Sequence, residues 1–110
     1  MPSPVFLGEF EQLVLIAVLR LKDDTGVLAL KGTLDEIAGR TVSRGALYRT
    51  LDRLADKRWI DWSVDGEVRP ERGGHPRRQL RVTPAGVAVL RASRRTLLGL
   101  WRGLEKELGR

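Results

Sequence analysis

The chain has 110 residues, no cysteine and one histidine, and its 20 Lys and Arg against 14 Asp and Glu give a net charge of +6. A chain of this length forms one small domain. The lack of cysteine excludes a disulfide scaffold, a thiolate nucleophile and cysteine-based metal sites. Since one histidine cannot build a metal cluster either, we expect no metal and no cofactor.

The start of the chain and its apolar runs bear on its location. Residues 1–6 lack the basic stretch and the apolar run of a signal peptide. The longest purely apolar run, Leu13–Leu19, is too short to cross a bilayer. These features predict a cytoplasmic protein without a membrane partner.

The positive charge is concentrated in the middle of the chain. Residues 1–39 carry a net charge of −3, residues 40–95 a net charge of +8, and residues 96–110 a net charge of +1. A basic segment of this kind is typical of a surface that binds a polyanion, and nucleic acid is the commonest one. The alternative is an arginine-rich surface that is merely solvated.

Residues 8–22 are predicted to form a helix that is apolar on most sides. Such a helix has to be buried on most sides. In a domain of this size it must pack against its own core and against something further, such as a second subunit. The residues of this helix that we expect at a dimer interface are Phe10, Leu13 and Val14.

A second helix is predicted over residues 27–38, where apolar residues follow helical spacing. Thr25 is a candidate N-cap, and Gly39 stands where a left-handed C-cap is expected. Thr33 and Glu36 have the spacing of a capping box, so a start at Thr33 is the alternative.

Residues 43–58 carry the clearest local helix signal. Ser43 is an N-cap candidate, and Leu47, Leu51 and Leu54 form an apolar stripe on one side. The opposite side and its flank are polar and basic, which suits contacts with phosphates and guanine edges. The candidate DNA-binding residues of this helix are Ser43, Arg44, Gly45, Tyr48, Arg49 and Arg53.

Each of these assignments has a plainer alternative. The arginines have aspartates of the same helix at pairing distance, so they could be solvated surface residues that form intrahelical ion pairs. The ring of Tyr48 could close the edge of the core instead of contacting a phosphate.

Two short strands are predicted next, over Trp59–Val64 and Arg77–Val82, because apolar and polar residues alternate in both. Asp65-Gly66 is a turn signal, and the loop to Pro76 is longer than in most hairpins. Arginines around a Gly-Gly tip suit contacts along a phosphate backbone. The candidate DNA-binding residues of this wing are Arg72, Gly73, Gly74, Arg77 and Arg78.

A last helix is predicted from Pro84 to about Leu108, with Thr83 as its N-cap. Written as heptads, six of the seven residues at the two core positions are apolar. This pattern indicates a surface for self-association. The residues of this helix that we expect at a dimer interface are Leu90, Leu97, Trp101, Leu104 and Leu108.

Three helices, a hairpin and a further helix are the elements of a winged helix-turn-helix. We therefore predict a mainly α fold with a small β-hairpin. Residues 1–82 would form a winged helix-turn-helix DNA-binding domain, and residues 83–110 a C-terminal dimerisation helix packed with helix 8–22. Helix 43–58 would enter the major groove, and the wing, residues 65–78, would lie on the adjacent backbone or minor groove.

Two other classes of function are weighed against DNA binding. A winged-helix module that binds only proteins has the same element order, but it would not require arginines on the third helix and the wing. An enzyme is not expected, since no clustered Ser, His and Asp residues and no Gly-rich phosphate loop are present.

Several segments resemble the PadR family of transcriptional regulators. Leu7–Leu15 looks like the opening of family members, and Ser43–Tyr48 with Leu51–Leu54 is similar to their recognition helix. Glu71–Gly74 and Val82–Gly86 resemble the wing and its exit into the last helix. The segments occur in the family's order over nearly the whole chain, which makes them more specific together than any one alone.

The resemblance implies a homodimeric, sequence-specific repressor that binds double-stranded DNA at a palindromic operator. It also implies that the single C-terminal helix pairs with the N-terminal helix across the dimer. Some relatives respond to small molecules near this interface, so a small-molecule effector is a further candidate partner. Trp101 is a candidate wall of such a pocket, with plain dimer core as the alternative.

Overall fold

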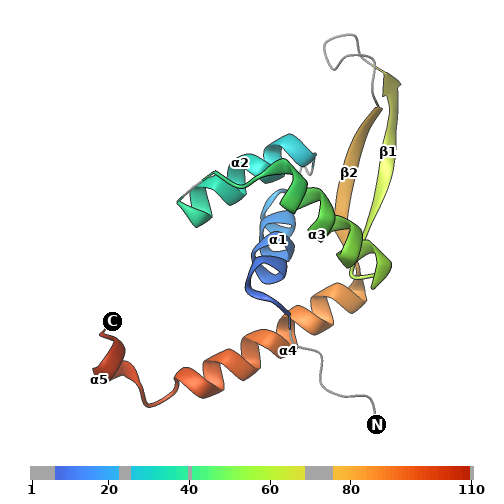
Figure 1. Cartoon of the computed structure of the whole chain (residues 1–110). Helices are drawn as coiled ribbons and strands as arrows, with labels where there is room; N and C mark the ends of the chain where they lie inside the picture. The colour runs from blue at the N-terminus through green and yellow to red at the C-terminus, as the bar shows by residue number, and fades with distance from the viewer. Residues whose placement is uncertain (1–6, 23–25, 40, 69–75, 110) are drawn as a thin grey trace.

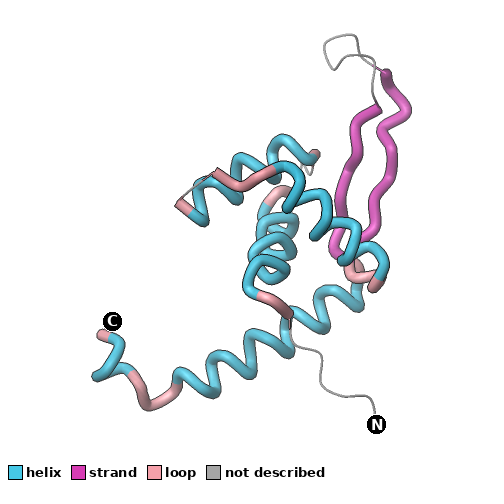
Figure 2. The backbone as a smooth tube through the Cα atoms, viewed as in Figure 1, coloured by secondary structure: helices cyan, strands magenta, loops and turns pink. Residues whose placement is uncertain are grey.

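The computed structural model describes residues 7–22, 26–39, 41–68 and 76–109. Three helices precede a two-stranded antiparallel hairpin, and a long and a short helix follow it (Figures 1 and 2). The predicted mainly α fold with a small β-hairpin is confirmed. The elements are α1 (Glu9–Arg20), α2 (Val27–Ala38), α3 (Arg44–Asp56), β1 (Ile60–Val68), β2 (Pro76–Val82), α4 (Pro84–Trp101) and α5 (Glu105–Leu108).

Helix α1 is the centre of the molecule, because it contacts α2, α3, β2 and α4 (Figure 1). Val14, Leu15 and Ala17 have no exposed surface. Val14 was expected at a dimer interface, but its complete burial inside one chain leaves it no surface for a partner. Around α1 the core is completed by Leu30, Leu34, Leu47, Leu51, Leu54, Ile60, Leu80 and Val82.

The helix ends follow local capping chemistry. Glu11 accepts a hydrogen bond from the Gly8 N–H at 3.0 Å, at the start of α1. Helix α2 begins at Val27 after Gly26, so the alternative start at Thr33 is wrong, whereas Thr25 lies outside the described residues. Gly39 ends α2 with φ +66°, as expected of a left-handed C-cap.

The hairpin is longer than the alternation predicts. Ile60 pairs with Val82, and the register continues to Val64 opposite Arg78. After an irregularity the strands pair again at Val68 and Pro76, so a turn at residues 65–66 is wrong. Asp65 and Gly66 lie within β1 instead of in a turn, because the two strands pair again beyond them.

Helix α4 is shorter than the heptad pattern predicts. It ends at Trp101, and Gly103 takes a left-handed conformation with φ +86° before α5 begins. A helix cannot continue through that conformation. The expectation of one helix to about Leu108 is therefore wrong, and Leu104 and Leu108 do not lie on the helix that carries Leu97.

The strongest steric constraint lies where α3, the hairpin and α4 meet. Arg58, which follows the C-cap residue of α3, has φ +62°, and its carbonyl accepts a 2.7 Å hydrogen bond from the Thr83 hydroxyl. The Trp59 carbonyl accepts the Thr83 N–H at 2.9 Å. A Cβ on Gly86 would lie 2.2 Å from that same carbonyl oxygen, so only glycine fits at this point of α4.

Replacing Gly86 tests this constraint. We expect Gly86→Ala to lower the free energy of unfolding by about 1–3 kcal/mol, because α4 has to move away from Trp59. Gly32→Ala is the matched control: Gly32 is an exposed residue inside α2 whose added Cβ meets nothing within 4 Å. The control should raise stability by up to about 1 kcal/mol. Urea denaturation followed by circular dichroism measures both, and equal effects would refute the constraint.

Candidate nucleic-acid interface

Helix α3 separates a buried side from an exposed basic side. Leu47, Thr50, Leu51 and Leu54 are buried. The candidate contact residues all lie on the exposed side, and all are accessible to solvent. They are Ser43, Arg44, Gly45, Tyr48, Arg49 and Arg53.

The N-terminus of α3 is suited to an anion. The Ser43 side chain accepts the Ala46 N–H at 3.1 Å, which confirms Ser43 as the N-cap. The first turn of α3 contains no acidic side chain. The free N–H groups of that turn and the positive end of the helix dipole therefore face solvent without a competing carboxylate.

The arginines of α3 differ in how they are held. A Cβ built on Gly45 would lie 3.3 Å from Nη1 of Arg49, so this guanidinium lies along the first turn of the helix. Arg53 donates a 3.2 Å hydrogen bond to the hydroxyl of the buried Thr50. Arg44 and Arg49 are thus gathered at one end of α3, with Arg53 one turn further along.

The expected wing residues are placed only in part. Arg72, Gly73 and Gly74 lie outside the described residues, whereas Arg77 and Arg78 belong to β2. The hairpin extends from the C-terminal end of α3 beyond the helical core (Figure 1). Arg81, nearer its base, is engaged by Asp61 through hydrogen bonds of 3.1 and 2.7 Å.

A carboxylate of α2 fixes where α3 starts. Asp35 accepts the Val42 N–H at 2.7 Å and the Lys31 ammonium at 2.9 Å. The bond to Lys31, and then the bond to Val42, hold the pKa of Asp35 below its ordinary value. Because Val42 directly precedes Ser43, the charged form of Asp35 positions the N-cap of α3.

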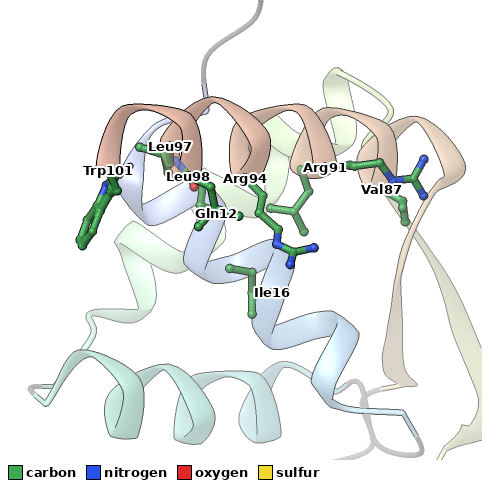
Figure 3. Close-up of a pocket in the computed structure, with 9 residues that line it drawn as sticks. Gln12, Ile16, Val87, Arg91, Arg94, Leu97, Leu98 and Trp101 are labelled. Carbon is green, nitrogen blue, oxygen red and sulfur yellow. The ribbon is translucent and has the colours of Figure 1, made fainter. Parts of the chain in front are cut away.

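A groove of about 540 Å³ lies between α1 and α4, mostly lined by apolar surface. Ile16 and Gln12 of α1 face α4 across it, and Trp101 stands at one end (Figure 3). Two guanidinium groups, of Arg91 and Arg94, also line the groove.

The residues expected at a dimer interface are exposed to different degrees. Leu97, Trp101, Leu104 and Leu108 are exposed, with Trp101 58% accessible. Phe10, Leu13 and Leu90 are partly buried against the core. The solvent-exposed apolar surface among these residues lies mainly on the C-terminal half of α4 and on the residues that follow it.

Several residues that shape these surfaces escaped the sequence analysis. Gly86 positions α4 against Trp59, which is distant in sequence, and Asp35 accepts the Val42 N–H across the connection between α2 and α3, so helical periodicity marks neither contact. Leu98 lines the groove but stands outside the heptad positions of the last helix, and Ile16 of α1 was not among the residues expected at an interface. Arg94 interrupts the heptad pattern, and that interruption is the one signal in the sequence for a polar group in the groove.

Metal-binding clusters and membrane-spanning helices are both absent from the described residues. Among the described residues no three His, Cys, Asp or Glu side chains come together in a way that could hold a metal ion. In the same part of the chain, every helix is too short or too polar to cross a membrane.

Comparison with known proteins gives a consistent result. The model of the transcriptional regulator PadR-like family matches residues 15–92. A PadR family transcriptional regulator from Eggerthella lenta superposes with a TM-score of 0.67 at 25% identity, covering 92% of this chain and 87% of that one. No curated protein matches the sequence.

Two further solved structures share the fold. A PadR-like transcription factor from Bacteroides fragilis has a TM-score of 0.62 at 23% identity and covers 90% of this chain and 85% of its own. The circadian clock associated protein Pex from Anabaena has a TM-score of 0.53 at 23% identity, with coverage of 88% and 86%. The winged-helix arrangement predicted from the element order is thereby confirmed.

The role of Asp35 predicts a dependence of stability on pH. A carboxyl whose pKa is lowered by folding stabilises the fold above its unfolded pKa of about 3.9, and this stabilisation is lost as the pH falls through the folded value. Asp35→Asn keeps an acceptor for Val42 but removes the charge. We expect this variant to be less stable than the wild type at pH 7, and we expect the difference to be smaller at about pH 2, after the pH has fallen below the unfolded pKa toward the folded one.

The measurement is urea denaturation at both pH values, with Glu36→Gln on the exposed side of α2 as the control for net charge. A stability difference between Asp35→Asn and the wild type that is the same at both pH values would contradict the role of the carboxylate charge.

Proposed function

Because the chain belongs to the PadR-like family of transcriptional regulators, we propose that it is a homodimeric repressor that reads a palindromic operator. The fold is that of a DNA-binding regulator. The observation that carries the proposal is the exposed basic side of α3, where the contact residues from Ser43 to Arg53 face solvent together.

In this proposal α3 enters the major groove with its N-terminal half. Arg44 and Arg49 reach guanine edges or adjacent phosphates through their forked guanidinium groups. Ser43 and Gly45 let the backbone of the first turn approach a phosphate closely. Tyr48, which is 41% exposed, donates its hydroxyl to the same backbone.

The wing, residues 65–78, lies along the DNA backbone or in the minor groove beside α3. Its arginines neutralise phosphates and release counterions, so binding weakens steeply as salt rises. The contacts that we assign to the wing are Arg72, Gly73, Gly74, Arg77 and Arg78.

A second copy of the chain covers the exposed apolar surface of α4. Leu97, Leu98, Leu100 and Trp101 are all at least 41% exposed at the end of the helix that projects from the core (Figure 1). An apolar surface of this extent is unusual on a monomer and is typical of an interface. Phe10, Leu13 and Leu90 form the inner edge of the proposed contact, and Leu104 and Leu108 extend it.

A two-fold dimer determines the form of the operator. Two α3 helices related by the two-fold axis read two half-sites about one helical turn apart. Blocking a promoter that contains such a site represses transcription.

The groove between α1 and α4 is the proposed site of a small-molecule effector. Its volume of about 540 Å³ falls within the range of ligand pockets, and Trp101 supplies an aromatic wall. Because the groove shares Leu97, Leu98 and Trp101 with the proposed dimer contact, a ligand there changes how the two subunits pack.

Removing two arginines of α3 tests the DNA-binding surface. We expect Arg44→Ala combined with Arg49→Ala to weaken binding to duplex DNA at least roughly tenfold and to flatten the salt dependence, since two cationic contacts are lost. Arg91→Ala combined with Arg102→Ala removes the same charge from α4 and its C-terminal end and should have a much smaller effect. Fluorescence anisotropy in a salt titration measures the affinities.

Binding of the wild-type protein to duplex DNA in the same salt titration tests the proposal as a whole. Failure to bind any duplex at low salt would contradict the proposal and favour the winged-helix module that binds only proteins.

Charge placed on the apolar surface tests the dimer. Leu97→Asp combined with Leu104→Asp should convert the dimer to a monomer, because two carboxylates would be buried at the contact. Leu28→Asp combined with Ile37→Asp alters two exposed apolar residues of α2 instead and should leave the dimer intact. Sedimentation gives the masses, and a dimer that survives the first pair of changes would overturn the proposed interface.

A further inference from the structure

A mostly buried carboxylate joins α1 to the C-terminal end of α3. Glu11 of α1 is only 13% exposed in its side chain, and its Oε2 lies 3.8 Å from the ammonium of Lys57. Lys57 is the C-cap residue of α3 and is about half exposed. The pair therefore links a central helix of the core to the helix that carries the candidate DNA contacts.

Helix capping accounts for only one oxygen of Glu11. Oε1 accepts the Gly8 N–H at 3.0 Å, which is an ordinary way to stabilise a helix start. Oε2 has almost no exposed surface and accepts no hydrogen bond among the described residues. A buried carboxylate oxygen without such a bond is costly, and the nearby ammonium of Lys57 offsets that cost.

The position of Lys57 is defined by its neighbours. Its ammonium also lies 4.9 Å from the centre of the Trp59 ring. The Trp59 N–H bonds to the Leu54 carbonyl in the last turn of α3 at 3.0 Å. The carboxylate and the ring together hold the Lys57 side chain beside the end of α3.

Both ends of α3 are thus held by a carboxylate of another helix. Asp35 of α2 binds the backbone just before the N-cap, and Glu11 of α1 faces the C-cap residue. Two points define a direction, so the two carboxylates together define the direction of α3 within the domain.

We propose that Glu11 is a positioning residue for operator recognition, which acts through Lys57 to set the orientation of α3 relative to α1. The inference rests on the proposed function. In the proposed dimer α1 belongs to the layer next to the second subunit, so the orientation of α3 relative to α1 sets the spacing of the two α3 helices. Reading bases requires that spacing, whereas non-specific binding to phosphates does not.

The variants distinguish the specific position of the Glu11 carboxylate from a general loss of one negative charge on α1. Glu11→Gln keeps an acceptor for Gly8 and removes the charge that attracts Lys57. Glu9→Gln removes the same charge from an exposed residue in the same first turn of α1. Lys57→Met removes the cation but keeps the length of the side chain, and the double variant Glu11→Gln with Lys57→Met completes a mutant cycle.

Two DNA probes are used at one salt concentration: a duplex that the wild type selects from a random pool, and unselected random duplex. We expect Glu11→Gln and Lys57→Met each to lower the ratio of selected to random affinity by roughly three- to tenfold, with a double variant no worse than either. Glu9→Gln should raise both affinities slightly and leave the ratio unchanged. Unfolding of each variant by urea shows whether it is folded under the assay conditions.

The outcomes distinguish this inference from the proposed function. If the wild type selects no duplex, the proposed function fails. If it selects one and Glu11→Gln keeps the wild-type ratio, or if Glu9→Gln lowers the ratio equally, the positioning role of Glu11 is overturned. Losses that simply add in the double variant would also overturn it, since they would show that Glu11 does not act through Lys57.

Discussion

The contact between Gly86 and the Trp59 carbonyl is the constraint on which the rest of the arrangement depends. Any Cβ at position 86 would collide with that oxygen. Thr83 donates its hydroxyl to the Arg58 carbonyl and its N–H to the Trp59 carbonyl, so the residues that follow α3, the base of the hairpin and the start of α4 become one unit. The direction in which α4 leaves the core, and therefore the place of its apolar C-terminal half, follows from this junction (Figure 1).

The same junction explains why the candidate DNA contacts and the candidate dimer contacts are mechanically related. Helix α3 presents its basic side outward because its leucines are buried against α1, and it is held near its ends by Asp35 and Glu11. In space, helix α4 begins close to the end of α3. Together with α1 it lines the groove that contains Trp101. A change in how α4 packs on α1 therefore acts next to the contacts that orient α3, which is the route by which the proposed effector would alter DNA binding.

Local chemistry made much of this structure predictable from sequence. The serine before α3, the glycine after α2 and the threonine-proline pair before α4 act within a few residues, and all three are found as expected. Two features were not predictable because they depend on pairing and packing with other parts of the chain: the hairpin stays paired past Asp65-Gly66, and Val14 is completely buried inside one chain. The break at Gly103 is local, since this glycine takes φ +86°, but the regular heptad pattern on either side gives no sign of it. The exposed side of α3 followed from periodicity alone, whereas the carboxylates that orient it are visible only in three dimensions.

Two copies of α3 are proposed to read one duplex from the same face. Hydroxyl-radical footprinting of the protein on a duplex selected from a random pool tests this arrangement. We expect protected backbone segments arranged symmetrically about a centre, with the two halves about one helical turn apart. A single protected segment without symmetry, or protection that does not depend on the sequence of the duplex, would contradict it.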